Sequence, residues 1–550
     1  MSTILTLHDP QVARRYYAEG HWRGDTLYSL LAQHARARPD AYALRDARQR
    51  LSWSALVQWV ETIAADLHEA GLKRGQRVSV WLPNRAESVA VFLACSRNGY
   101  VCNPSLHQNY TVAEVVHLME RIQSAALFAQ RGYGADAHKS DVFEAARALP
   151  SLKRVYGVGE SGASACPAPG AAAREVPPPD GNPDKVVYLA FTSGTTGTPK
   201  GVLHSDNTLL ANGRAMVHDW RHDERTVLYS HSPVSHHIAT VAIEQSLVAG
   251  FELVLNDLPQ GMKPLDWIVE TGATYVMGVP THAVDLLTDL QRRGLSALGK
   301  VTMFYMAGST IPPETARAFL DLGVMPQNIY GMTENGSHQY TLPGDEVETI
   351  TSTCGRACAG YETRLWDAEN PDREAPPGET GEIGTRGALL MLGYFDNQSA
   401  TESAFNADGW FMSGDLGRLD ARGNLQIVGR KKDLIIRGGH NIHPSRIENL
   451  AVKHPAVLKA AAYPVADSRL GERVCLAVIA REGASVDGMQ LLAHLDATGL
   501  SRFDMPEYYI ALDAFPLTAS GKILKRELVE WTKSGRIKPE PVRWVSPEKV

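Results

Sequence analysis

Apolar and polar positions alternate with two different periods along the first third of the chain. Residues 77–82 form a short apolar, partly β-branched run that predicts a buried strand, and residues 87–98 follow with a helical pattern that Gly99 would end. A cleaner helical spacing follows, which places these residues on one face: Val112, Val115, Val116, Met119 and Ile122. Thr111 and Glu114 can form a capping box at the start of this helix. Strand–helix alternation of this kind predicts an α/β sheet with helices packed on its faces.

The length of the chain predicts more than one domain, because a single core seldom grows beyond about 250–300 residues and this chain has 550. We place a boundary near Arg430–Asp433, which gives an N-terminal domain over residues 1–430 and a C-terminal domain over 431–550. The smaller domain has a strand pattern at 474–480 and a helix pattern at 489–497. The predicted fold is therefore α/β, with a large N-terminal domain of several subdomains and a small α+β C-terminal domain.

Two segments show no periodic pattern of apolar residues. Residues 157–184 are rich in Gly, Ala, Ser and Pro, which favours a surface excursion within the large domain. Residues 533–550 are polar and contain three prolines, so we expect a loose tail.

Composition excludes several classes of protein. A hydrophobic content of 44% and a formal charge of −6 are ordinary for a globular protein and argue against a dedicated nucleic-acid surface. No run approaches the ~18 apolar residues that a membrane span requires, and the N-terminus has too short an apolar patch for a signal peptide. The six cysteines are few and scattered, as in proteins that keep their thiols reduced. We therefore expect a cytoplasmic protein without a membrane span.

The clearest chemistry lies in the stretch from Thr192 to Gly201, which follows a strand pattern at 186–191. The stretch combines three glycines, several hydroxyl side chains and one lysine. Glycine lets backbone N–H groups approach an anion closely, and a nest of such donors concentrates positive potential. The stretch therefore predicts a phosphate-binding loop. It is not a Walker loop, because Lys200 is followed by glycine and not by the Ser or Thr that would hold magnesium.

This loop is very similar to the signature loop of the adenylate-forming (ANL) superfamily, which includes acyl-CoA synthetases, carrier-protein-loading adenylation domains and luciferases. Further segments resemble motifs of this superfamily and follow in its order: Tyr330–Glu334, Thr380–Ile383, Gly409–Asp415, Gly429–Asp433 and Pro516–Ile523. The resemblance covers residues 25 to 530 or so and is to the acyl- and aryl-CoA synthetase branch. It implies an N-terminal domain that binds AMP and the acyl group, followed by a mobile C-terminal domain.

The resemblance assigns most of these motifs to ATP. In the family the loop meets the phosphates, an aromatic residue packs on adenine, an aspartate grips the ribose hydroxyls and an arginine lies near ribose and phosphate. The corresponding residues here are Thr192, Ser193, Gly194, Thr195, Thr196, Lys200, Gly308, Ser309, Thr310, Tyr330, Gly331, Met332, Asp415 and Arg430.

Joining a carboxylate to the α-phosphate of ATP brings two anions together, so the site needs cations and a metal where charge develops. The resemblance implies that Lys522 bridges the carboxylate and the α-phosphate, that Thr333 meets phosphate and that Glu334 binds Mg²⁺. The carboxylate of Asp415 suits two ribose hydroxyls because it only accepts hydrogen bonds. Three of these residues have a simpler interpretation: Lys522 as a solvated surface lysine, Glu334 as a glutamate at a helix start and Asp415 as a helix-capping aspartate.

The acid would lie beside a histidine segment. His236 ends a stretch that resembles the family's Pro-x-x-His motif at the acyl pocket, although a structural role for this histidine is equally open. The other residues assigned to this pocket are His237, Ile238, Val241, Gly278 and Ala307. An amino acid would need a buried carboxylate for its ammonium group, and no acidic residue precedes Glu244 in this stretch. We therefore expect an uncharged, mainly apolar acid that is aromatic, alicyclic or medium-chain.

A second reaction is implied by the C-terminal motifs. Gly438 and Gly439 lie in a stretch that resembles the Gly-Gly-x-Asn-Ile-x-Pro loop of CoA ligases, where paired glycines let a pantetheine arm pass close to the backbone. His440 and His443 depart from the usual sequence of this loop. Lys432 matches the hinge about which the C-terminal domain turns between the two half-reactions.

These observations predict an acid–thiol ligase that uses ATP, Mg²⁺ and CoA: a carboxylic acid becomes acyl-AMP with release of pyrophosphate, and CoA then accepts the acyl group. The alternative is a stand-alone enzyme that loads an aryl or acyl group onto a phosphopantetheinyl carrier protein. The missing Gly-Lys-Ser/Thr disfavours a P-loop phosphohydrolase. The presence of Glu334, Asp415 and Lys522 disfavours a non-catalytic nucleotide-binding protein. The oligomeric state, including a homodimer, stays open.

Overall fold

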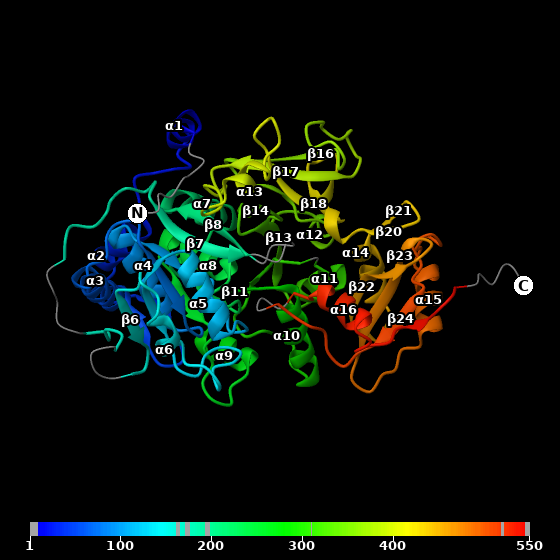
Figure 1. Cartoon of the computed structure of the whole chain (residues 1–550), viewed down its shortest axis with the longest axis horizontal. Coiled ribbons are helices and arrows are strands. Elements are labelled where there is room, and N and C mark those ends of the chain that lie inside the picture. Colours follow the sequence, from blue (N-terminus) through cyan, green and yellow to red (C-terminus); the bar gives the residue numbers. More distant parts are fainter. Residues whose placement is uncertain are drawn as a thin grey trace, which may run out of the picture.

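A computed structural model describes residues 9–160, 165–170, 176–192, 199–309, 311–518 and 522–544. In these ranges the chain forms four β-sheets. Two large sheets with their helices make up the left half of Figure 1, a small sheet lies above them, and the C-terminal part lies at the right. No helix in these ranges combines the length and the apolar character needed to cross a bilayer.

The first large sheet has nine strands, and its central strands are parallel. Antiparallel strands close both edges, and the turn between β13 and β14 belongs to one of the predicted motifs. The order is β15 (Arg356–Ala357), β14 (Gly336–Tyr340), β13 (Met325–Met332), β12 (Met303–Met306), β11 (Tyr275–Gly278), β9 (Val227–Ser230), β10 (Glu252–Leu255), β1 (Tyr42–Arg45) and β2 (Arg50–Ser52).

The second large sheet has six strands, of which all but the last are parallel. Its antiparallel edge pair flanks the predicted phosphate loop. The order is β6 (Arg154–Gly157), β5 (Ser124–Ala129), β3 (Arg77–Trp81), β4 (Val101–Asn103), β7 (Val186–Thr192) and β8 (Lys200–Ser205).

A layer of helices fills the space between the two large sheets. Their apolar side chains share one core with inward-facing residues of both sheets, which is why these helices are apolar on more than one side. They are α2 (Leu27–Ala37), α3 (Trp53–Glu69), α4 (Ala86–Asn98), α7 (Asp206–Trp220) and α8 (His237–Ala249). Helix α8 is buried over His237–Leu247, is capped by His236 and ends at Gly250, which has φ +74°.

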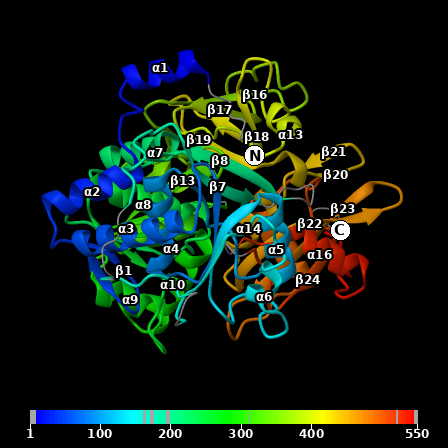
Figure 2. The same cartoon turned by 60° about the vertical axis from the view of Figure 1, so that its left-hand side comes forward.

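Other helices cover the outer faces of the two sheets, and each set has its own core. On the second sheet lie α5 (Val112–Arg121) and α6 (Val142–Ala146); on the first lie α9 (Pro264–Thr271), α10 (Pro280–Arg292) and α11 (Pro313–Asp321), with α12 (Val347–Ser352) against α11. Helix α1 (Pro10–Ala18) packs Ala13 and Tyr16 into the central core. The resulting layers are helix, sheet, helix, sheet and helix (Figures 1 and 2).

The small sheet is antiparallel throughout and brings two further motifs to one edge. Its strands are β16 (Tyr361–Trp366), β17 (Gly381–Gly387), β18 (Phe411–Leu419) and β19 (Leu425–Arg430), with α13 (Gln398–Glu402) before β18. A single 3₁₀ turn, η1 (Lys431–Asp433), then leads to the C-terminal sheet.

The C-terminal part is a sheet with helices on both faces. Alternate residues of β22 (Val457–Asp467) and β23 (Gly471–Ala480) enter two different cores, as the two-residue period of a strand requires. The other strands are β20 (Ile435–Arg437), β21 (His440–Ile442), β24 (Tyr508–Ala511) and β25 (Glu540–Pro541). Helices α14 (Pro444–Ala451) and α15 (Gly488–Ala497) cover one face, and α16 (Lys525–Lys533) covers the other.

The fold agrees with the predicted α/β class and with the elements that have a clear period. Helix α4 ends at Gly99 with φ +71°. Helix α5 starts with the predicted capping box: the backbone N–H of Thr111 donates to Oε2 of Glu114 over 2.7 Å, and the N–H of Glu114 donates to Oγ1 of Thr111 over 3.3 Å.

The prediction of a loose tail from residue 533 onward is wrong for its described part. Residues 540–541 form β25, which pairs with β24, and the backbone N–H of Val542 donates to Glu507 O over 2.9 Å. Val542 and Trp544 also pack against the core beneath α14 and α15. Two apolar side chains in a proline-rich stretch are enough to hold it, although they give no periodic pattern.

Candidate active site

The predicted motifs meet where the small sheet lies over the end of the first large sheet. Tyr330 to Met332 end β13, and a tight turn leads into β14. A Cβ at Gly331 would overlap the carbonyl oxygen of Gly336 across this turn, so only glycine fits. The N–H of Met332 donates to Oδ1 of Asn335 over 2.9 Å, which fixes the turn that presents Thr333.

Asp415 is held by two donors at the edge of the small sheet. Its register partner on β19 is Arg430, whose Nε donates to Oδ1 of Asp415 over 3.1 Å. The hydroxyl of Tyr330 donates to Oδ2 over 3.0 Å. Burial raises the pKa of Asp415, and Arg430 opposes this effect most strongly. A fixed carboxylate with two accepting oxygens suits the paired hydroxyls of a ribose.

Glu334 is a buried carboxylate with a phenol and a cation beside it. The hydroxyl of Tyr394 donates to Oε1 of Glu334 over 3.0 Å, and Nζ of Lys200 lies 4.6 Å from the centre of the Tyr394 ring. Burial raises the pKa of Glu334, while its own backbone, Tyr394 and Lys200 lower it. The predicted alternative for Glu334, a helix start, is wrong, because it lies in the turn between β13 and β14.

These residues fit magnesium as a companion of ATP. Mg²⁺ takes one or two carboxylates together with phosphate oxygens and waters, and Glu334 supplies a carboxylate beside the predicted phosphate loop. The described ranges contain no group of three or more His, Cys, Asp or Glu that could hold a metal without such help.

Lys522 reaches this site from the C-terminal part. A Cβ built at Gly308 would lie 3.4 Å from Cε of Lys522, 3.4 Å from Cγ1 of Val279 and 3.8 Å from Cδ1 of Ile238. Burial and the repulsion of Arg430 lower the pKa of Lys522 to about 8, while Asp415 and Glu334 act in the opposite direction. The reading of Lys522 as a solvated surface lysine is therefore wrong.

Lys522 is tied to Thr518 by two hydrogen bonds. The N–H of Thr518 donates to the carbonyl oxygen of Lys522 over 2.7 Å, and the N–H of Lys522 donates to Oγ1 of Thr518 over 3.0 Å. An isolated bridge between Leu517 and Ile523 continues this pairing. Helix α16 begins shortly after, so the lysine tip is tied to the C-terminal core.

The predicted phosphate loop is described at its two ends. Thr192 pairs with Lys200 across the antiparallel β7–β8 edge. Ser193, Gly194, Thr195 and Thr196 lie outside the described residues, as does Thr310. Ser309 lies in the loop after β12 next to Gly308, whose φ is +96°.

His236 caps α8 and lies within the electrostatic influence of Lys522. Its Nδ1 accepts a hydrogen bond from the N–H of Ile238 over 3.4 Å, which leaves the proton of the neutral ring on Nε2. Burial lowers the pKa of His236 well below its usual range, and the charge of Lys522 lowers it further. The neighbouring Ser235 shares a hydrogen bond of 2.9 Å with Nδ1 of His107, an interaction between distant segments that no local motif indicates.

His237 leads into the interior along α8. Its ring lies parallel to that of His204, with centroids 5.6 Å apart, and its Nδ1 lies 3.3 Å from the hydroxyl of Tyr188. Nε2 of His204 donates to the carbonyl oxygen of Thr333 over 2.7 Å. His204 therefore connects the histidine segment with the magnesium motif, and the sequence reasoning missed it.

The other residues predicted for the acid lie on α8, β11 and the end of β12. The N–H of Ala307 donates to the carbonyl oxygen of Gly278 over 3.3 Å, and Ile238 lies near Lys522. A Cβ at Gly278 would lie 3.1 Å from Nδ1 of His282, so Gly278 borders a second pair of histidines. Val241 is fully buried on the next turn of α8.

The hinge and pantetheine motifs lie on the C-terminal side of this site. Lys432 is the central residue of η1. Its neighbour Lys431 forms an ion pair of 3.0 Å with Glu382, which also accepts from the N–H of Gly414. Gly438 and Gly439 have φ +58° and +87° and form the turn between β20 and β21, at the upper edge of the C-terminal part in Figure 1.

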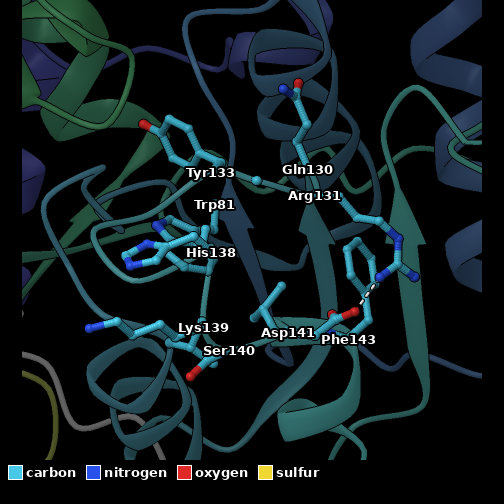
Figure 3. A pocket seen from close by; sticks show the side chains of 13 residues that line it. Trp81, Gln130, Arg131, Tyr133, His138, Lys139, Ser140, Asp141 and Phe143 are labelled. Carbon is cyan, nitrogen blue, oxygen red and sulfur yellow. Dashed lines mark hydrogen bonds and ion pairs between the residues drawn. The ribbon is translucent and has the colours of Figure 1, made fainter.

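A further pocket lies away from these residues. It has a volume of about 300 Å³ and borders the loop after β5, where Trp81, Tyr133 and His138 surround it (Figure 3). Arg131 and Asp141 form an ion pair at its rim. Because this pocket contains none of the predicted site residues, we do not assign the activation chemistry to it.

Comparison with known proteins agrees with the motifs. Residues 31–395 match the model of the AMP-binding enzyme family, and residues 446–522 match that of the AMP-binding enzyme C-terminal domain. The medium-chain fatty-acid–CoA ligase of Escherichia coli (strain K12) is 29% identical, with 96% of this chain and 93% of that protein covered. The 2-hydroxy-7-methoxy-5-methyl-1-naphthoate–CoA ligase of Streptomyces carzinostaticus is 32% identical, with 94% and 95% covered.

Solved structures lead to the same family. The ATP-bound MatB of Rhodopseudomonas palustris superimposes with a TM-score of 0.78 at 27% identity, covering 93% of this chain and 100% of that one. The fold and the order of its parts are therefore those of adenylate-forming enzymes.

Proposed function

Because the chain belongs to the AMP-binding enzyme family, we propose that it is an acid–thiol ligase. It joins a carboxylic acid to ATP, forming acyl-AMP and releasing pyrophosphate, and then transfers the acyl group to the thiol of CoA. The observation that carries this proposal is the position of Lys522, which lies in the same buried region as Glu334, Asp415 and His236.

In the first reaction the charges of the site would act on two anions. Lys522 acts electrostatically on His236 and is itself influenced by Asp415 and Glu334, so its ammonium group would meet both the carboxylate of the acid and the α-phosphate. Asp415 would hold the ribose, and Lys200 would meet the phosphates beside Glu334. Mg²⁺, when bound with ATP at Glu334, would neutralise charge on the phosphates. Neutral His236 would border the reacting acid.

The second reaction requires Lys522 to leave, and we propose that the chain beyond Lys432 turns as one domain (431–550) against residues 1–430. Close to the link, Lys431 forms an ion pair of 3.0 Å with Glu382, and Oγ of Ser445 donates to the carbonyl oxygen of Val428. Farther from the link, Lys453–Glu314 and Lys459–Asp285 are ion pairs of 3.9 Å, the long limit for such pairs, and contribute little to stability. Short contacts beside η1 and long ones away from it suit a rotation about Lys432.

CoA is favoured over a carrier protein by an exposed aromatic residue beside the Gly438–Gly439 turn. Phe503 is 73% exposed, the largest exposure of a bulky apolar side chain in the described chain, and its ring lies 6.2 Å from that of His440. Arg437 and Arg446 lie close to the same loop. An exposed ring with cations suits an adenine nucleotide, which CoA carries and a phosphopantetheinyl arm does not.

The test is pyrophosphate release from ATP over a panel of acids, followed by addition of CoA or of a holo-carrier protein. We expect benzoate, cyclohexanecarboxylate or octanoate to exceed acetate and α-amino acids, since each buried CH₂ contributes about 0.8 kcal/mol. We expect the thioester to form with CoA, and Phe503→Ala to raise the KM for CoA without changing pyrophosphate release. If the acyl group is transferred to the carrier protein and not to CoA, the carrier protein is the acceptor and the proposal of CoA is wrong.

A further inference from the structure

Glu244 is a buried carboxyl group that the proposed reaction does not use. Its residue is 0% exposed, and neither Oε1 nor Oε2 has a hydrogen-bond partner in the described structure. Buried polar groups in folded proteins are almost always paired, because an unpaired one loses its hydration without replacement. An unpaired carboxyl group in the middle of the central core therefore indicates a partner that arrives from outside.

Glu244 lies on the helix that leads inward from the reaction site. It lies seven positions after His237 on α8, and a rise of about 1.5 Å per residue places it about 10 Å farther along the helix. On the α7 side, a Cβ at Gly213 would lie 2.9 Å from Cβ of Glu244. The glycine at this crossing therefore brings no side chain of its own to pair with the carboxyl group.

Two phenols lie within the electrostatic influence of Glu244, and one of them contacts the predicted acid pocket. Glu244 acts electrostatically on both Tyr188 and Tyr305, in each case raising the pKa of the phenol that burial already raises. The hydroxyl of Tyr188 lies 3.3 Å from Nδ1 of His237, and that of Tyr305 lies 2.8 Å from Oγ of Ser337 on β14. Glu244 is thus near a phenol that itself contacts His237 at the start of α8.

We propose that Glu244 binds a hydroxyl group at the far end of the acid substrate. This inference rests on the proposed function and names its substrate class: a medium-length acid with an otherwise apolar tail and a terminal hydroxyl. Burial raises the pKa of Glu244 well above its usual range and so favours the protonated carboxyl group, which offers one donor and one acceptor. A hydroxyl group also offers one donor and one acceptor, so the two groups can each donate one hydrogen bond to the other.

The test compares 4-hydroxycinnamate with 4-methylcinnamate, which has a similar size but no donor. We expect the wild-type kcat/KM for pyrophosphate release to favour the hydroxy acid by at least 100-fold, since a site built to bind a hydroxyl rejects an analogue that lacks it. Glu244→Leu should bring this ratio close to one, and Glu244→Gln, which keeps a donor and an acceptor, should retain part of it. An unchanged ratio in Glu244→Leu, or a wild-type preference for the methyl acid or for 4-(aminomethyl)cinnamate, overturns the proposal.

Two controls separate the possible failures. Glu252→Gln removes another buried carboxylate, which pairs with Arg50 at a distance of 2.7 Å, and should leave the ratio unchanged. Binding of the two cinnamates is also measured by calorimetry, which tests the hydroxyl preference even if no acid releases pyrophosphate and the proposed function is wrong. The melting temperature of Glu244→Leu should not fall, because the variant removes an unpaired polar group. If neither Glu244→Leu nor Glu244→Gln folds, Glu244 has a structural role and the proposal is overturned.

Discussion

Lys522 lies against Gly308, although the two residues come from opposite sides of the proposed hinge. A Cβ at Gly308 would lie 3.4 Å from Cε of the lysine, and the φ of +96° at Gly308 is one that residues with a side chain rarely adopt. The backbone at this position therefore favours glycine, while a Cβ there would only come into van der Waals contact with the lysine. The structure shows the arrangement in which an acid could be activated.

Lys522→Ala should cripple formation of acyl-AMP and largely spare thioester formation from acyl-AMP that is supplied ready-made. Loss of a charge placed between two anions in a water-poor site should raise the first barrier by about 3–4 kcal/mol. The two half-reactions are measured separately, by pyrophosphate release and by thioester formation. Lys533→Ala, at an exposed lysine of α16, is the control. An equal loss in both half-reactions would contradict the role given to Lys522.

The first half-reaction should weaken at alkaline pH. The pKa of Lys522 is lowered to about 8, and only the protonated form carries the charge that the reaction needs. The kcat/KM for ATP should therefore be constant below about pH 8 and fall above it. Lys522→Arg keeps its charge at all these pH values and should extend the plateau, even at a lower rate. A falling limb that survives in Lys522→Arg would assign the titration to another group.

Gly331→Ala should weaken ATP binding and destabilise the protein. Its Cβ would overlap the carbonyl oxygen of Gly336, so β13 and β14 must separate and Tyr330 must shift away from Asp415. Overpacking of this kind costs about 1–3 kcal/mol. Calorimetric binding of ATP and the melting temperature provide the two measurements. Gly344→Ala is the matched control, because its Cβ would meet no atom within 4 Å.

Lys432→Pro should produce the opposite kinetic pattern from Lys522→Ala. Proline fixes φ near −65°, a value compatible with the 3₁₀ turn seen here but not with a large rotation. Pyrophosphate exchange should survive and thioester formation should fail. Lys432→Ala leaves φ free and should support both reactions. Wild-type rates for both steps in the proline variant would place the pivot elsewhere.

The sequence predicted those parts of the site that are encoded in short strings of neighbours. Tyr330, Glu334, Asp415 and Lys522 each lie in a motif that resembles one of the adenylate-forming superfamily, and the structure brings them into one region, while their roles stay predictions. The capping box at Thr111 was predictable for the same reason, because its two partners lie within one turn of helix.

Contacts between distant segments could not be predicted in this way. Glu382 lies in the family-like segment Thr380–Ile383, but its partner Lys431 lies far away along the chain. Tyr394 and its partner Glu334 are likewise 60 residues apart. His204 has no local signal, since its role comes from a strand pairing that places it beside His237.

Helix α8 has a consequence for how relatives of this protein can diverge. All residues from His237 to Leu247 are buried, and the helix contacts α2, α7 and strands of the first large sheet while its start forms part of the reaction site. A mutation that reshapes the acid pocket along α8 therefore also alters the packing of the central core, and neighbouring residues in contact do not change stability independently. New preferences should arise through linked replacements on α8 and α7, where Gly213 and Glu244 already meet. In this fold a change of substrate preference is therefore expected to involve replacements in the core as well as at the surface of the pocket.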